Sequence, residues 1–126
     1  MNPLDLAVDL ARKAGAIQME HLGKPHTVDY KGPIDIVTEV DAQCDKLIVD
    51  GLVNAFPDHG IVAEEGSSRP TKNGYEWIID PLDGTVNYAH GYPLFGPSIA
   101  LAYKRKPVLG VVLEPSQTTH VRSRTG

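Results

Sequence analysis

The stretch WIIDPLDGTVNYAHGYP, residues 77–93, places two carboxylates and a hydroxyl directly after a short apolar segment. The apolar triplet predicts a buried strand, and Pro81 has no amide hydrogen with which to continue the ladder of hydrogen bonds. Asp80 therefore stands at the carboxyl end of the strand, with Asp83 and Thr85 in the turn that follows. Because Asp-Pro and Asp-Gly are also common in ordinary turns, the stretch predicts either a plain turn or a site for a divalent cation and a phosphate.

The oxygen atoms of this turn match the ligands that Mg²⁺ prefers, which are carboxylates, carbonyl oxygens and waters. A turn here can direct the Leu82 carbonyl oxygen toward the same space as the carboxylates of Asp80 and Asp83. Gly84 allows close approach of the backbone, and residues 84–88 are expected to open a short helix whose free amides face an anion. A cation in this place can activate a water as the nucleophile, and a pair of cations can also hold the leaving oxygen.

A second acidic pair, Glu64 and Glu65, ends another expected strand, GIVAEE at residues 60–65. Adjacent glutamates repel each other, and a nearby cation would relieve the repulsion. The alternative is that both side chains are solvated in a loop, which is the usual state of an isolated Glu-Glu pair. The presence of the other acidic strand end in the same chain favours a shared site.

The composition, with 41% apolar and 22% charged residues, predicts one globular domain over residues 1–126. The net charge of −4, without a basic face, argues against a nucleic-acid-binding module. The apolar stretches fall short of the roughly 18 residues that cross a bilayer, and the first residues lack the pattern of a secretory signal. The one cysteine, Cys44, has no partner for an internal disulfide. We therefore expect a soluble, cytoplasmic protein with no membrane partner.

Hydrophobic spacing predicts two amphipathic helices, at residues 3–22 and 39–56. Thr38 is the expected N-cap of the second helix, and Asp41 follows three residues later, as in a capping box. Between the helices, two short extended pieces are expected around a turn at Gly32-Pro33.

After the second helix the pattern changes to short strands. Arg105 and Lys106 are expected to join the third and fourth of them as a hairpin. The strands are expected at residues 60–65, 75–80, 97–104, 107–114 and 119–124. This order predicts an α+β fold in which two helices pack on a largely antiparallel sheet. A sheet edge exposed at the last strand would invite pairing with another chain, so a homo-oligomer is expected.

Several segments, in their order and spacing, together resemble the N-terminal part of the inositol monophosphatase family, whose members are Mg²⁺-dependent, lithium-sensitive phosphomonoesterases. The segments are DIVTEVDAQCDKLI, AEEG, WIIDPLDGTVNYAHGYP and SIAL…GVVLEP. The similarity runs from the first helix to about residue 124. It implies the N-terminal half of a layered α/β/α/β/α sugar-phosphatase fold, a small phosphorylated substrate and a dimer.

The resemblance also implies a set of metal ligands. Glu64, the first acid of AEEG, resembles the family's glutamate ligand, and Asp80 resembles the carboxylate that two cations share. Leu82 resembles the carbonyl ligand, and Asp83 the ligand of the second cation. Family members bind two or three Mg²⁺ ions.

The catalytic and substrate-binding roles are carried over in the same way. Thr85, together with Glu64, resembles the group that activates the attacking water. Asp83 and the amides of Gly84 and Thr85 resemble the family's substrate-binding groups.

Three further residues resemble supporting groups of the family. Asp41 resembles an acid near the water, although helix capping explains it equally well. Lys31 and Glu65 resemble outer residues of the site, and for Lys31 the alternative is a solvated loop lysine.

The resemblance implies a phosphomonoesterase that hydrolyses inositol monophosphate, or a related sugar or cyclitol phosphate, by metal-activated water. Family members continue into a second half that supplies another aspartate and most contacts to the alcohol, and we expect this chain to lack that half. We therefore expect ligands for a first Mg²⁺ and an incomplete set for a second. The alternatives are a weakly active or inactive binding or assembly domain, completed by a partner copy, and a relative that acts on nucleotide or fructose bisphosphates.

Overall fold

The computed structural model describes the backbone of residues 2–23, 34–63, 67–117 and 120–125. Within these described residues, three α-helices, five strands and a short 3₁₀ helix follow one another. Their bounds are α1 Pro3–His21, α2 Ile34–Ala55, β1 Gly60–Ala63, β2 Tyr75–Asp83, α3 Thr85–Ala89, β3 Gly96–Tyr103, β4 Lys106–Glu114, η1 Pro115–Gln117 and β5 His120–Thr125.

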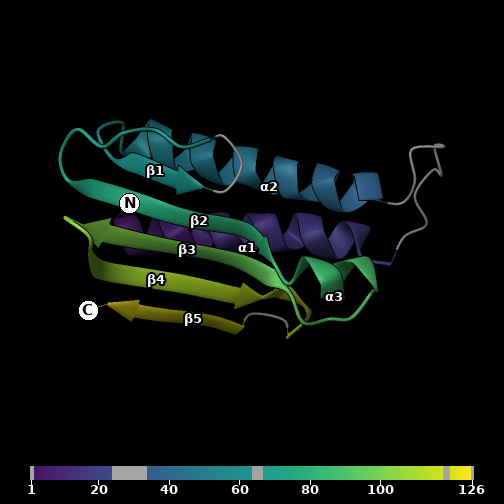
Figure 1. Ribbon diagram of the computed structural model, residues 1–126. Helices are drawn as coiled ribbons and strands as arrows, with labels where there is room; N and C mark the ends of the chain where they lie inside the picture. The colour runs from purple at the N-terminus through teal and green to yellow at the C-terminus, as the bar shows by residue number, and fades with distance from the viewer. Residues whose placement is uncertain (1, 24–33, 64–66, 118–119, 126) are drawn as a thin grey trace.

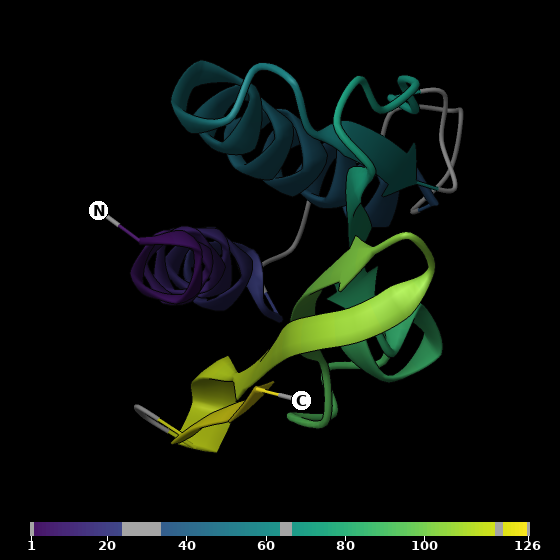
Figure 2. The ribbon, with the colours of Figure 1, turned by 90° about the vertical axis from the view of Figure 1, so that its left-hand side faces the viewer.

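The strands form one sheet in the order β1-β2-β3-β4-β5. β1 pairs with β2 in parallel, and every other neighbouring pair is antiparallel. Helices α1 and α2 lie side by side on one face of this sheet, and the short α3 lies at the end where β2 leads into β3 (Figures 1 and 2). The expected α+β fold, with two helices on a largely antiparallel sheet, is confirmed. Among the described helices, none is long and apolar enough to cross a membrane.

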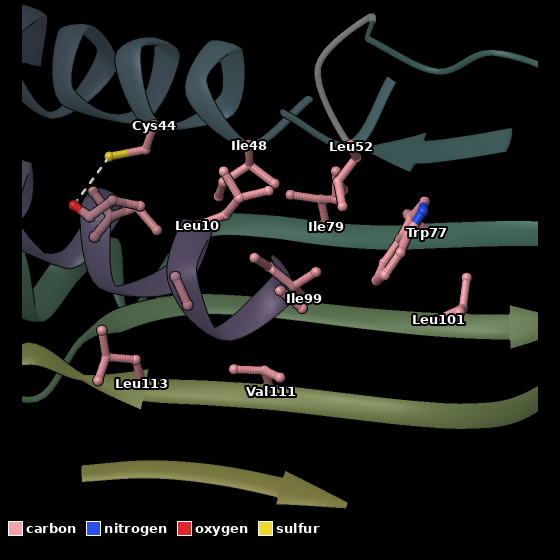
Figure 3. Close-up of a cluster of buried hydrophobic side chains, with 14 of the residues drawn as sticks. Leu10, Cys44, Ile48, Leu52, Trp77, Ile79, Ile99, Leu101, Val111 and Leu113 are labelled. Atoms are coloured by element: carbon pink, nitrogen blue, oxygen red, sulfur yellow. Dashed lines mark hydrogen bonds between the residues drawn. The ribbon is translucent and has the colours of Figure 1, made fainter. Parts of the chain in front are cut away.

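The core lies between the two long helices and the sheet. Gly51 marks the close approach of the helices, since a Cβ atom there would stand 2.6 Å from the Leu10 side chain. Figure 3 shows Ile48 and Leu52 of α2 above Ile79 of β2. The buried apolar side chains include Ala7, Leu10, Ala11 and Ala14 of α1, Val40, Cys44, Ile48 and Leu52 of α2, and Trp77, Ile79, Ile99, Leu101, Val111 and Leu113 of the sheet.

The opposite face of the sheet is open in the described part of the chain. No described helix covers it (Figure 2), and Val62, Ile78 and Val112 expose their side chains there. These residues alternate with buried neighbours, as expected for strands with one packed face and one open face.

The second helix begins at Ile34 and not at residue 39, so the expectation of an extended segment over residues 34–38 was wrong. Val37 packs against the core and continues the stripe of Val40 and Cys44 by one turn. Thr38 therefore lies inside the helix and is not its N-cap, and Asp41 is not part of a capping box. The rest of the expected extended region, with the turn at residues 32–33, lies outside the described residues.

The second strand also differs from the expectation, because it continues past Pro81 to Asp83. Pro81 interrupts the ladder without ending it, and pairing with β3 resumes at Asp83. The hairpin between β3 and β4 turns at Lys104 and Arg105, one residue earlier than expected. Both residues have positive φ angles, 48° and 68°. Two consecutive positive φ angles are typical of the type I′ turn that suits the twist of a hairpin.

An aromatic cluster closes the end of the core that lies away from α3. His59 is 9% exposed and stacks between Phe56 and Tyr75, with ring centroids 4.7 and 5.0 Å away. Its Nδ1 accepts a hydrogen bond of 3.0 Å from the indole Nε1–H of Trp77. Because Nδ1 accepts this hydrogen bond, it carries no proton and the imidazole is neutral. Burial lowers the pKa of His59 below its ordinary value, and the nearby charge of Asp58 raises it by a smaller amount.

We expect acid to weaken the fold through His59. Because its folded-state pKa is lowered, its contribution to stability is full above the unfolded pKa of about 6.5 and is lost as the pH falls below that value. One such group changes the free energy of unfolding by at most about 1.4 kcal/mol per pH unit. Urea unfolding at pH 7.5 and 5.5 measures this loss. His59→Gln keeps an acceptor for Trp77 without titrating, so it should lose less stability between the two pH values; an identical loss would contradict the assignment.

The hairpin turn offers a stabilising substitution. Arg105 has φ 68°, a conformation that costs an L-residue roughly 1–2 kcal/mol and glycine almost nothing. Arg105→Gly should therefore raise the free energy of unfolding by about 0.5–1 kcal/mol, after the larger unfolded-state entropy of glycine is subtracted. The control is Lys106→Gly, in the first residue of β4, which should lower stability in the same urea experiment. Equal effects of the two variants would argue against the turn type.

Candidate metal and phosphate site

A β-bulge separates the two aspartates of the motif. Asp80 pairs with Ser98 and Asp83 pairs with Gly96, so three steps along β2 match two steps along β3. Strand β2 therefore contains one extra residue between the two pairs. Bulges of this kind bend a strand and change the direction in which its side chains point.

The bulge places both carboxylates on the open face of the sheet. Side chains of a regular strand alternate between faces, so residues three apart would point to opposite sides. Ile79 is buried on the helix face, and Asp80 follows it on the open face. After the extra residue, Leu82 returns to the core at 2% exposure and Asp83 is exposed. One inserted residue thus brings the Asp80 and Asp83 side chains to the same side.

The end of β1 lies beside this bulge. Ala63, its last residue, pairs in parallel with Ile79, the residue before Asp80. The Ser68 hydroxyl accepts from the Ala63 amide and donates to its carbonyl oxygen, at 3.1 Å in both cases. The chain therefore leaves β1 at a fixed point next to Asp80, and Glu64 and Glu65 follow directly. Both glutamates lie outside the described residues.

The donors that the structure describes fit a hard cation in type. Asp80 and Asp83 supply carboxylates on one face, and the bulge between them contains the Leu82 carbonyl oxygen, the kinds of oxygen that a hard cation prefers. Among the described residues, no three His, Cys, Asp or Glu side chains lie close enough together to hold a metal ion. A further carboxylate is needed, and Glu64, next to Ala63, is the candidate that the sequence offers.

Gly84 turns the chain from β2 into α3. Its φ of 83° and ψ of 40° are left-handed, and a Cβ atom there would lie 2.7 Å from the Leu94 carbonyl oxygen and 3.2 Å from the Phe95 Cα. Glycine is therefore required on two grounds, backbone conformation and space. The expected short helix is confirmed at Thr85–Ala89, and Thr85 is its exposed first residue. The first amides of a helix have no acceptor within the helix, so they are available to a ligand.

The loop after α3 is held by its own hydrogen bonds. The Asn87 side-chain amide donates to the Leu94 carbonyl oxygen (2.9 Å), and the Tyr92 amide donates to the Asn87 carbonyl oxygen (2.8 Å). Tyr88 meets Phe95 edge to face, with ring centroids 4.8 Å apart. Asn87 therefore shapes this turn, and the Tyr88–Phe95 contact packs against the Gly84 turn.

Asp41 lies on α2 near the bulge. Its side chain is half-buried, three residues before Cys44. Burial raises the pKa of the Cys44 thiol to about 11, a hydrogen bond from Gln18 lowers it, and the nearby Asp41 charge raises it further. Gln18 in turn donates to the Pro81 carbonyl oxygen in the bulge. Since helix capping no longer explains Asp41, its role as an acid beside the site stays a prediction. Lys31 lies outside the described residues.

Sequence reasoning missed Gln18. It is 0% exposed, on the buried face of α1 with Leu10, Ala11 and Ala14. The available signal was an uncharged polar residue within an apolar helical stripe, which indicates a hydrogen-bond partner in the core.

Comparison with known proteins gives a consistent result. Residues 2–126 match the model of the inositol monophosphatase family. The chain is 41% identical over 118 residues to inositol monophosphatase 2 of Solanum lycopersicum, covering 89% of this chain and 44% of that protein. It is 44% identical over 117 residues to a fructose-1,6-bisphosphatase/inositol-1-monophosphatase of Thermotoga maritima, covering 92% and 45%.

A solved structure has the same fold. The crystal structure of the extragenic suppressor protein SuhB from Bartonella henselae superimposes with a TM-score of 0.84 at 31% identity, over 97% of this chain and 47% of that one. The chain thus spans less than half the length of the relatives it matches.

The space around Gly84 gives a prediction for this turn. Gly84→Ala should lower the free energy of unfolding by more than the roughly 1–2 kcal/mol that a left-handed alanine costs, because the new Cβ also meets Leu94. The matched control is Gly91→Ala, with φ 75° but nothing within 4 Å of the added Cβ. Urea unfolding of both variants measures the difference. Equal losses would mean that the Leu94 contact does not constrain the turn.

Proposed function

The chain belongs to the inositol monophosphatase family, and from this premise we propose that it forms the cation- and phosphate-binding part of a Mg²⁺-dependent phosphomonoesterase. The observation that supports this most directly is the bulge in β2. It turns Asp80 and Asp83 to one face of the sheet, directly before the left-handed Gly84 and the exposed Thr85. A plain turn would need neither the extra residue nor this choice of side chains.

The proposed ligands are the carboxylates of Glu64, Asp80 and Asp83 and the Leu82 carbonyl oxygen. Bound Mg²⁺ would supply Lewis-acid stabilisation of the phosphate charge and a more acidic water.

Side chains and amides of the chain would then position the attacking water and the phosphate. Thr85 would hold the attacking water with its hydroxyl, Glu64 would accept the proton, and the amides of Gly84 and Thr85 would bind phosphate oxygens. Asp41, Lys31 and Glu65 would support these groups from outside.

The proposed substrate is inositol monophosphate or a related sugar or cyclitol phosphate. Relatives whose names differ in the alcohol match this same stretch at similar identity, among them the Thermotoga protein named for both fructose 1,6-bisphosphate and inositol 1-phosphate. This stretch therefore fits the chemistry that such substrates share, the phosphate and the cation. The alcohol would be recognised largely by residues that correspond to the relatives' other half, which would also complete the ligands of a second cation.

The experiment follows phosphate release from inositol monophosphate, together with Mn²⁺ binding by calorimetry. We expect turnover that needs Mg²⁺ and stops on chelation. Asp83→Asn keeps the size of the side chain but removes a charge, so it should weaken Mn²⁺ binding at least about 10-fold. The control is Asp50→Asn, an exposed carboxylate on α2 that pairs with Lys46. Turnover unaffected by chelation, or equal Mn²⁺ affinities in the two variants, would overturn the proposal.

A second candidate function is assembly, and the open face of the sheet favours it. Val62 on β1 and Ile78 on β2 are paired and exposed on that face, and Val112 is exposed on the same face on β4. Self-association by light scattering, without Mn²⁺ binding or turnover, would favour this function over the phosphatase.

A further inference from the structure

One buried side chain connects the first helix to the bulge. Gln18 on α1 donates from Nε2 to the Pro81 carbonyl oxygen at 2.6 Å, across 63 residues of sequence. Its other contact through the same nitrogen is with the Cys44 sulfur at 3.6 Å. A hydrogen bond of 2.6 Å is short for an amide donor, so this contact fixes the peptide group more firmly than the one to sulfur does.

The backbone of the same residue holds the other side of the turn. The Tyr88 hydroxyl on α3 donates to the Gln18 carbonyl oxygen at 2.8 Å. Pro81 precedes the Asp83-Gly84-Thr85 segment and Tyr88 follows it. Gln18 therefore contacts both ends of the segment that contains Leu82, Asp83 and Thr85, from the helix side of the sheet.

Core stability does not explain this choice of residue. Gln18 is fully buried, and its Oε1 has no hydrogen-bond partner among the described residues. A buried acceptor without a partner lowers stability, whereas an apolar side chain of similar size would fill the same space without that cost. The hydrogen bonds of the Gln18 side chain therefore come from Nε2, and the shorter of its two contacts is with the Pro81 carbonyl oxygen.

The hydrogen bond from Gln18 to Pro81 matters for the candidate site because the described ladder leaves the Pro81 backbone without a β3 partner. Proline has no amide hydrogen, and no residue of β3 pairs with Pro81 or Leu82 in the described ladder. Contacts from outside the sheet must therefore determine the orientation of the Pro81–Leu82 peptide group. A peptide group turned differently would move the Leu82 carbonyl oxygen and the Asp83 side chain with it.

We infer that Gln18 is a positioning residue: its amide sets the conformation of the β2 bulge and thereby the geometry of the cation ligands. This inference builds on the proposed function, because the ligands it positions are those of the proposed cation site. Gln18 touches neither cation nor substrate, so it acts only through the bulge.

The experiment compares Gln18→Met with Cys44→Ala. Methionine matches glutamine in length but cannot donate to Pro81, whereas Cys44→Ala removes the other partner of the same amide and leaves the Pro81 bond intact. Gln18→Asn is made in parallel, because its amide is one methylene too short to reach. The first measurement is amide hydrogen exchange in residues 80–90 without any metal, and the second is Mn²⁺ binding by calorimetry. Urea unfolding records the stability of each variant.

We expect both Gln18 variants to exchange faster in residues 80–90 and to bind Mn²⁺ about 10-fold more weakly, as for other outer groups of metal sites. Cys44→Ala should match the wild type in the exchange of residues 80–90 and in Mn²⁺ affinity, even if its free energy of unfolding is lower. Unchanged exchange and affinity in a folded Gln18 variant would overturn the inference and leave the proposed function intact. A wild-type chain that fails to bind Mn²⁺ would overturn the proposed function, and the metal-free exchange would still decide whether Gln18 sets the bulge.

Discussion

The extra residue in β2 is the constraint on which the candidate site depends. Side chains of a strand alternate strictly, so carboxylates three positions apart would otherwise lie on opposite faces of the sheet. One of them would then point into the core, where an unpaired charge is costly. The bulge places Leu82 in the core and leaves Asp80 and Asp83 on the open face. The same local change thus satisfies the core and brings the two carboxylates of the proposed cation site to one face.

Two residues from other elements contact the bulge or its pairing partner, Gln18 on α1 and Gly96 on β3. On β3, Gly96 pairs with Asp83, and a Cβ atom at Gly96 would stand 1.7 Å from the Leu113 carbonyl oxygen. Strands β3 and β4 are therefore packed as closely as glycine permits, at the level where β2 resumes its pairing with β3. Gln18 holds the bulge from the helix side. The backbone of the motif is therefore contacted both by β3 and by α1.

The sequence predicted the parts of the fold that local patterns determine. The stripe of α1, the start of β2 and the short helix after Gly84 follow from periodicity and from glycine and proline, which act over a few residues. The continuation of β2 past Pro81 could not be predicted in this way, because it depends on Gly96 and on Gln18, which are distant in the sequence. The start of α2 was missed because Thr38 is a good N-cap, whereas the packing of Val37 extends the helix beyond it.

The polar groups behind the site are also insensitive to pH. Burial, and to a smaller extent Cys44, raises the pKa of Tyr88 to about 12, and burial raises the pKa of Cys44 to about 11. Both groups therefore remain protonated near neutral pH, and Tyr88 continues to donate to the Gln18 carbonyl oxygen while Cys44 donates to the Ala14 carbonyl oxygen at 3.5 Å (Figure 3). The neutral amide of Gln18 does not titrate at all. The hydrogen bonds that connect α1 with α2, with the bulge and with α3 therefore stay the same over the neutral pH range.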